Sequence, residues 1–157
     1  MASDLVRMLK AKTRKKPPMN VKHSRDYDEL ARLIFSESAH NTSNPAKVML
    51  GSSVLNRADA GREFGNNIHD VIYKPNAYYG VGNERWEDFI NQNTLDATGK
   101  GFAQTTALGL LTGKIPRVEG QFFFTPEEEE RQRKYGFKFN LVRPTGQYDN
   151  WNTYTYK

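Results

Sequence analysis

The sequence predicts an α+β fold that is mainly helical, in a single domain with a short β element and a basic N-terminal arm. Apolar residues recur at helical spacing in four segments between residues 27 and 111. Beyond Pro116, short aromatic runs alternate with polar residues, a pattern typical of strands. A length of 157 residues suits one domain with its own core.

The basic arm comprises residues 1–25 and the domain residues 26–157. The arm holds eight Lys or Arg against one Asp, a local charge of +7, whereas the domain has 15 basic and 17 acidic side chains. The domain itself is therefore not expected to bind nucleic acid. Ser3 and Asp4 could cap a short amphipathic helix ending before Pro17, which would dock on a protein assembly. A solvated, disordered tail is the alternative.

The first helix of the domain is expected from about residue 27 and contains the main candidate for chemistry. Tyr27, Leu30, Leu33 and Ile34 share one face, and Glu37 falls in the middle of that apolar stripe. Burial raises the pKa of a carboxylate, so Glu37 could hold a proton near neutral pH, as a general acid must. The alternative is a structural Glu37 that reaches solvent or pairs with a buried arginine. A polar run over residues 38–44 indicates a wettable cleft and favours the acid.

A second helix is expected from Asn44 and Pro45, a cap followed by proline, to about Ala58. Small residues at 51–53 would let another helix approach closely. Arg57 falls near the buried face, where it could pair with a carboxylate or bind substrate. A snorkelling surface arginine is the alternative.

Residues 59–82 are expected to form loop and turn, with a short apolar run at Ile68, Val71 and Ile72. The segment 73–80 displays aromatic rings and an amide between Pro and Gly. Such side chains suit sugars, which offer apolar C–H faces for stacking and hydroxyl groups for hydrogen bonds. The alternative for Tyr78 or Tyr79 is that it closes the core, which we expect for at least one of them.

Four further elements follow. A third helix over about 84–91 would place Trp86, Phe89 and Ile90 on one side, and a fourth over about 101–111 would end at Gly113. Residues 121–125 predict a short buried strand. A helix from Pro126 has acidic residues at its start and basic residues at its end, as the helix dipole favours. Residues 137–156 are expected to be extended.

Several classes of chemistry find no support in the sequence. Cysteine is absent, the three histidines lack the spacing of a metal site, and no phosphate loop or serine-nucleophile motif occurs. We therefore expect no zinc and no cofactor. No segment approaches the roughly 20 apolar residues that span a bilayer, so a soluble protein is expected. Acid catalysis on a polar, uncharged substrate fits best.

Three separated segments resemble the SleB-type cell-wall hydrolases, a family that includes spore-cortex-lytic enzymes. They are residues 30–37 (LARLIFSE), 51–57 (GSSVLNR) and 71–75 (VIYKP). The resemblance covers about residues 27–79 well and continues weakly at 107–113, 122–126 and 154–156. Their order along the chain makes the resemblance fairly specific.

The resemblance implies a lysozyme-like domain that cleaves the glycan strands of peptidoglycan, with Glu37 as its acid. Family members typically act as lytic transglycosylases, in which one carboxyl group serves first as acid and then as base, so that no second catalytic carboxylate is required. Asp59, Glu63 and Asp70 remain candidates for a second acid. The substrate-binding side chains expected around Glu37 are Ser38, Tyr73, Asn76, Tyr78, Tyr79 and Phe124.

Two departures from the family pattern concern the cleft. Ser38 stands where the family usually has alanine, and the family's glycine-asparagine-histidine segment near the C-terminus is missing. A non-catalytic binding or structural module, anchored to a larger assembly by the arm, is therefore the alternative function. With no recognisable signal peptide, a component carried in bacteriophage particles to open the host wall is expected, or otherwise delivery by another export route.

Overall fold

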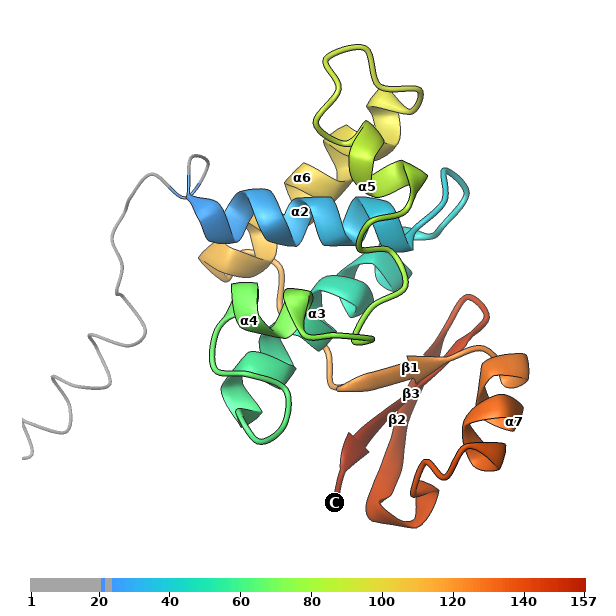
Figure 1. Cartoon of the computed structure of the whole chain (residues 1–157). Coiled ribbons are helices and arrows are strands. Elements are labelled where there is room, and N and C mark those ends of the chain that lie inside the picture. Colours follow the sequence, from blue (N-terminus) through green and yellow to red (C-terminus); the bar gives the residue numbers. More distant parts are fainter. Residues whose placement is uncertain (1–20, 22–23) are drawn as a thin grey trace, which may run out of the picture.

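The computed structural model describes residue 21 and residues 24–157. The predicted short helix of the arm, and every basic residue of the arm except Arg25, lie outside the described residues. In the described part the fold is α+β and mainly helical, which confirms the predicted class (Figure 1). The elements are α2 (Arg25–Glu37), α3 (Asn44–Ala60), α4 (Ile68–Tyr73), α5 (Glu84–Asp88), α6 (Ala97–Thr112), β1 (Phe122–Phe124), α7 (Pro126–Lys134), a 3₁₀ turn (Phe139–Leu141), β2 (Val142–Tyr148) and β3 (Trp151–Tyr156).

Helix α2 is the centre of the helical part and contacts α3, α4, α5 and α6 (Figure 1). Ser24 caps it by accepting a hydrogen bond from the backbone N–H of Tyr27, as an N-cap serine typically does. The predicted apolar face is confirmed, because Leu30, Leu33 and Ile34 are fully buried. Glu37 is the last residue of the helix.

Helix α3 packs closely on its neighbours at Gly51, as the small residues predict. A Cβ at Gly51 would lie 2.5 Å from Leu110 Cδ1 of α6 and 2.9 Å from Ile34 Cδ1 of α2. The start of the helix is shifted by one residue from the expectation. Ser43, rather than Asn44, is the N-cap and accepts from the backbone N–H of Ala46.

Two local predictions were wrong. The segment 59–82 is not all loop, because Asn67 caps the short helix α4 and the apolar run of that helix is buried. Ile90 does not join Trp86 and Phe89 on a buried face, since α5 ends at Asp88 and Ile90 is 65% exposed. Five residues are too short a helix to carry the face as far as Ile90.

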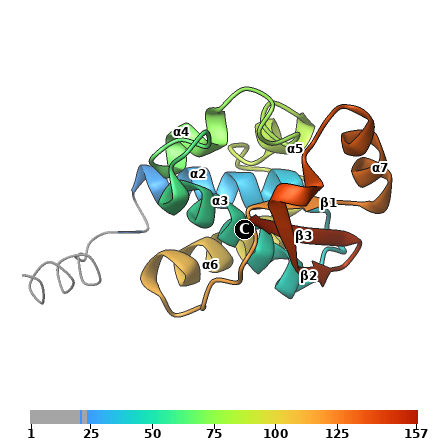
Figure 2. The same ribbon diagram turned by 90° about the horizontal axis from the view of Figure 1, so that it is seen from below.

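The C-terminal part is a three-stranded antiparallel sheet in the order β1-β3-β2, with α7 beside it (Figures 1 and 2). Strands β2 and β3 form the extended tail that the sequence predicts, with a register irregularity between Pro144 and Gly146. Strand β1 exists as predicted but is half-buried rather than buried, because it is an edge strand. Helix α7 starts with a capping box between Thr125 and Glu128.

Candidate active site

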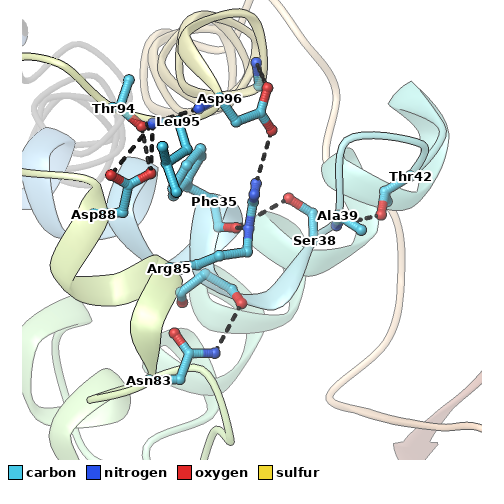
Figure 3. Close-up of polar contacts among 12 residues, drawn as sticks. Phe35, Ser38, Ala39, Thr42, Asn83, Arg85, Asp88, Thr94, Leu95 and Asp96 are labelled. Atoms are coloured by element: carbon cyan, nitrogen blue, oxygen red, sulfur yellow. Dashed lines mark hydrogen bonds and ion pairs between the residues drawn. The ribbon is translucent and has the colours of Figure 1, made fainter.

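The C-terminal end of α2, where Glu37 lies, is held by side chains from the α5 region (Figure 3). Arg85 Nε donates to the carbonyl of Phe35 at 2.8 Å, and Asn83 Nδ2 donates to the carbonyl of Ser36 at 3.3 Å. The last carbonyls of a helix have no partner within it, so these bonds satisfy groups that would otherwise need water. They also fix the backbone next to Glu37.

Arg85 connects this end of α2 to the start of α6 (Figure 3). Its Nη2 lies 3.2 Å from Asp96 Oδ2, and its guanidinium lies 3.8 Å from the centre of the Phe35 ring. Asp96 in turn caps α6 by accepting from the backbone N–H of Gly99 at 2.9 Å. One arginine thus joins three helices beside the candidate acid.

Glu37 faces a cavity of about 100 Å³ between the helices and the sheet. That volume admits water beside the carboxylate. The backbone N–H of Gly80 donates a hydrogen bond to Glu37 Oε2. The cavity is lined by Glu37, Arg57, Asn76, Ala77, Tyr78, Tyr79, Phe123, Phe124, Glu128, Gln132 and Trp151.

The surroundings of Glu37 favour its protonated form. Burial raises the pKa of Glu37 to about 7 and is the largest influence. The negative charge of Glu128 also raises the pKa, whereas the hydrogen bond from Gly80 and the positive charge of Arg57 lower it. At neutral pH both protonation states of Glu37 are therefore populated, which is the condition for an acid that must later act as a base.

Arg57 is buried at the cavity and is not the snorkelling surface residue that the sequence left open. Its Nε donates to the carbonyl of Gln121 at 2.6 Å, which ties α3 to the residue before β1. Its guanidinium lies 4.5 Å from the centre of the Tyr78 ring and 5.6 Å from that of Phe122. Aromatic faces stabilise a cation that has lost its water. The arginine therefore supplies a fixed positive charge near Glu37.

Four of the six predicted substrate-binding residues line the cavity with Glu37, namely Asn76, Tyr78, Tyr79 and Phe124. Tyr78 also closes the core, as expected for one of the two tyrosines, since it is buried and its hydroxyl lies 3.1 Å from Ser53 Oγ. Tyr79 is 74% exposed at the cavity. It thus offers a free aromatic ring to a ligand.

The other two predicted residues lie outside the cavity lining. The buried Ser38 donates its hydroxyl back to the carbonyl of Phe35 at 3.3 Å (Figure 3). Tyr73 is the last residue of α4 and packs edge-on against Trp86, with ring centres 5.8 Å apart. The order of residues in the loop could not reveal that α4 turns Tyr73 toward α5.

Apart from Phe124, the sequence did not reveal which residues of the C-terminal part line this cavity. Glu128 and Gln132 come from α7 and Trp151 from the start of β3. The Thr125–Glu128 capping box was a readable signal for where α7 begins. It contained no information about which face of α7 meets Glu37, because that depends on packing between segments about 90 residues apart.

The three acidic residues that were candidates for a second catalytic carboxylate form hydrogen bonds away from the cavity. Asp59 Oδ2 accepts from Arg117 at 2.6 Å, Glu63 accepts from the hydroxyl of Tyr156, and Asp70 accepts from Asn67. None of the three lines the cavity with Glu37.

Over residues 24–157, no group of three His, Asp or Glu side chains is placed to hold a metal ion. Within the same residues, none of the helices has the length and apolar character needed to cross a membrane.

Comparison with known protein families assigns the class of this protein. Residues 41–147 match the model of the cell wall hydrolase family. The match covers more than half of the chain, so the protein belongs to this family, whose substrate is peptidoglycan. Comparisons with curated proteins and with solved structures give no match. The matched segment includes the cavity residues of α3, α7 and the loops, but it begins after Glu37.

Proposed function

We propose that this protein cleaves the glycan strands of peptidoglycan and that Glu37 is its general acid. The observation that carries the proposal is the carboxyl group of Glu37, which faces a cavity large enough for water and whose pKa is raised to about 7. Its proton passes to the glycosidic oxygen as the bond to the anomeric carbon breaks. Family membership supplies the substrate class.

We further propose lytic transglycosylation as the route. After giving up its proton, Glu37 is the carboxylate that assists the C6 hydroxyl of muramic acid in closing an anhydro ring. The resemblance of residues 30–37 and 51–57 to SleB-type hydrolases supports this route. A pKa near 7 supports it as well, because neither protonation state of Glu37 is then costly to reach.

The cavity lining suits a saccharide. Tyr79 and Trp151 offer rings on which the apolar face of a sugar can stack, and Asn76 offers an amide for hydroxyl or acetamido groups. These contacts would place the glycosidic oxygen beside Glu37.

The acid is tested by the Glu37→Gln variant on purified sacculi, with muropeptide release measured by chromatography and mass spectrometry. We expect a loss of at least 100-fold, since general acid catalysis contributes roughly 10²- to 10⁴-fold. Glu130→Gln, which removes an exposed charge of α7, serves as the matched control and should retain wild-type activity. Undiminished release by Glu37→Gln would exclude Glu37 as the acid. Anhydro ends on the wild-type products would support transglycosylation, and hydrated reducing ends would contradict it.

We also propose that the protein is carried to the wall as part of a larger assembly, such as a bacteriophage particle. The charge of +7 over residues 1–25 supports this proposal, because a basic arm docks readily on an acidic protein surface. If the wild-type protein binds sacculi but releases no muropeptides, the alternative function, a non-catalytic binding module, is the correct one.

A further inference from the structure

A second hollow lies next to the cavity that holds Glu37, and Trp151 borders both. It has a volume of about 370 Å³, which is within the range of roughly 300–1,000 Å³ that is common for small-molecule sites. The start of β3 and the chain just after β1 therefore form a wall that the two spaces share. We call this second space the polar hollow, and its lining residues are Asn41, Thr42, Thr125, Asp149, Asn150 and Trp151.

The β2–β3 turn forms one side of the polar hollow and is fastened to α3. Asp149 accepts two hydrogen bonds from Ser43, one from its hydroxyl and one from its backbone N–H at 2.9 Å. Ser43 is also the N-cap of α3, so the turn is joined to the fixed start of a helix. A wall that is already ordered does not have to lose freedom when a ligand binds, which lowers the cost of binding.

The loop between α2 and α3 forms the other side of the polar hollow. Thr42 Oγ1 accepts from the backbone N–H of Ala39 at 2.7 Å (Figure 3). The backbone N–H of Thr42 donates in turn to the carbonyl of Ala39 at 3.0 Å. This loop begins directly after Glu37, so one short segment carries the candidate acid and then lines the polar hollow.

The side chains of the polar hollow have the chemistry that binds a sugar. Asn41 and Asn150 are exposed there, and each amide offers two donors and an acceptor to hydroxyl or acetamido groups. Thr42 adds a hydroxyl group, and Trp151 adds an aromatic face on which the apolar side of a sugar ring can stack. The polar hollow thus repeats the combination of amide and ring found in the cavity of Glu37.

The charge of the polar hollow favours the sugars of peptidoglycan over its peptide stems. None of the six lining residues is Lys or Arg, the side chains that pair with a carboxylate. Asp149 is the charged member of the lining, and the hydrogen bonds from Ser43 hold its pKa below the usual range. Its negative charge disfavours the carboxylates of a peptide stem, whereas an uncharged sugar is unaffected.

We propose that the polar hollow is a saccharide subsite, which binds an N-acetylglucosamine unit adjoining the muramic acid held beside Glu37. Trp151 contacts both sugars. The two sugars alternate along a glycan strand, so both neighbours of a muramic acid are N-acetylglucosamine, which carries neither a peptide stem nor a carboxylate. The proposal rests on the proposed function and names the part of the strand that is recognised next to the cleaved bond.

The first test measures binding of chitotetraose, an oligomer of N-acetylglucosamine, by isothermal titration calorimetry. The Glu37→Gln background prevents cleavage during the titration. Asn41→Ala combined with Asn150→Ala should weaken binding by about 10-fold, because two hydrogen bonds of ordinary net strength are lost. Asn93→Ala, at an exposed position in the loop between α5 and α6, is the matched control and should leave the affinity unchanged. Thermal unfolding checks that each variant is folded.

The second test measures cleavage of soluble glycan strands, with and without their peptide stems, by the wild type and by Asn41→Ala/Asn150→Ala. We expect KM to rise by about 10-fold and kcat to stay unchanged, because the lost contacts hold substrate and transition state equally. The rise should be the same for strands with and without stems. A merely structural role of the two residues would lower kcat and the unfolding temperature instead.

The outcomes separate this proposal from the proposed function. Unchanged chitotetraose affinity and unchanged KM in Asn41→Ala/Asn150→Ala would overturn the saccharide subsite. A rise in KM confined to strands that carry stems would also overturn it, because the polar hollow would then bind the peptide. Chitotetraose binding that depends on Asn41 and Asn150, in a protein that releases no muropeptides, would refute the proposed function and leave the saccharide subsite standing.

Discussion

At the residue scale, the candidate acid depends on the close approach of a loop. The backbone N–H of Gly80 donates to Glu37 Oε2, so the loop and the end of α2 are in direct contact. A Cβ at Gly80 would lie 2.5 Å from Glu37 Oε2 and 3.0 Å from the carbonyl carbon of Ser36. No side chain fits there, and glycine is required for space rather than for an unusual φ.

We therefore expect Gly80→Ala to displace Glu37 and to lower the rate of glycan cleavage by at least 10-fold, since small misplacements of a catalytic group are costly. Gly82→Ala is an unsuitable control, because Gly82 has a φ of +87°. Gly101→Ala, in α6 with nothing within 4 Å of an added Cβ, is the better comparison and should retain activity. Full activity of Gly80→Ala on sacculi would show that this contact does not position the acid.

At the element scale, helices α2, α3 and α6 meet at Gly51, where α3 has no side chain. Helix α3 approaches α2 and α6 at Gly51, so that an added methyl group would overlap Leu110 and Ile34. Ile34 is fully buried, and side chains in such a core have little freedom to move away. The packing of α3 also sets where Arg57, two turns further along, meets the cavity.

Gly51→Ala is expected to lower the free energy of unfolding by about 1 kcal/mol. Overpacking costs roughly 1–3 kcal/mol, and the better helix propensity of alanine returns about 1 kcal/mol. Gly101→Ala is the matched control, because Gly101 lies in α6 with nothing within 4 Å of an added Cβ. It should raise the free energy of unfolding by about 0.5–1 kcal/mol. Urea denaturation measures both, and a stabilised Gly51→Ala would show that the core yields at this point.

At the scale of the whole molecule, the site makes stability depend on pH. The pKa of Glu37 is about 7 in the folded protein against 4.5 ordinarily, so folding favours the protonated carboxyl group. Three carboxyl groups whose pKa the folded structure lowers act in the opposite direction, namely Glu63, Asp96 and Asp149. Hydrogen bonds from Ser43 hold the pKa of Asp149 below its usual range. Partial burial raises the pKa of Asp96, but hydrogen bonds from Gly99 and Arg85 outweigh it. The pKa of Asp96 therefore also lies below its usual range.

We expect the free energy of unfolding to be largest near pH 4.5–5. It should decline between about pH 4.5 and 7 by on the order of 2–3 kcal/mol, as unfolding lets Glu37 ionise. Below about pH 4 it should decline again, because Glu63, Asp96 and Asp149 lose their favourable charged state. Denaturation at several pH values measures this profile. Glu37→Gln should remove the decline between pH 4.5 and 7, and its persistence would contradict the raised pKa of Glu37.

How much could be predicted from the sequence differs from element to element. Caps and periodicity placed α2, α3, α6 and α7 to within a few residues, because their signals are local. The short α4 was missed, and Ile90 was placed on the wrong side, because short helices follow packing rather than propensity. The partners of Arg57 were left open, since they come from distant segments of the chain.

The sequence by itself determined that a carboxylate ends the apolar face of the first helix and that the fold is mainly helical. Both follow from residues that are near one another in the chain. The tertiary structure alone decided that Glu37 shares a cavity with Arg57, and that α7 brings Glu128 there instead of Asp59, Glu63 or Asp70. The physical reason is that burial, and the charges a buried group meets, depend on how distant segments pack.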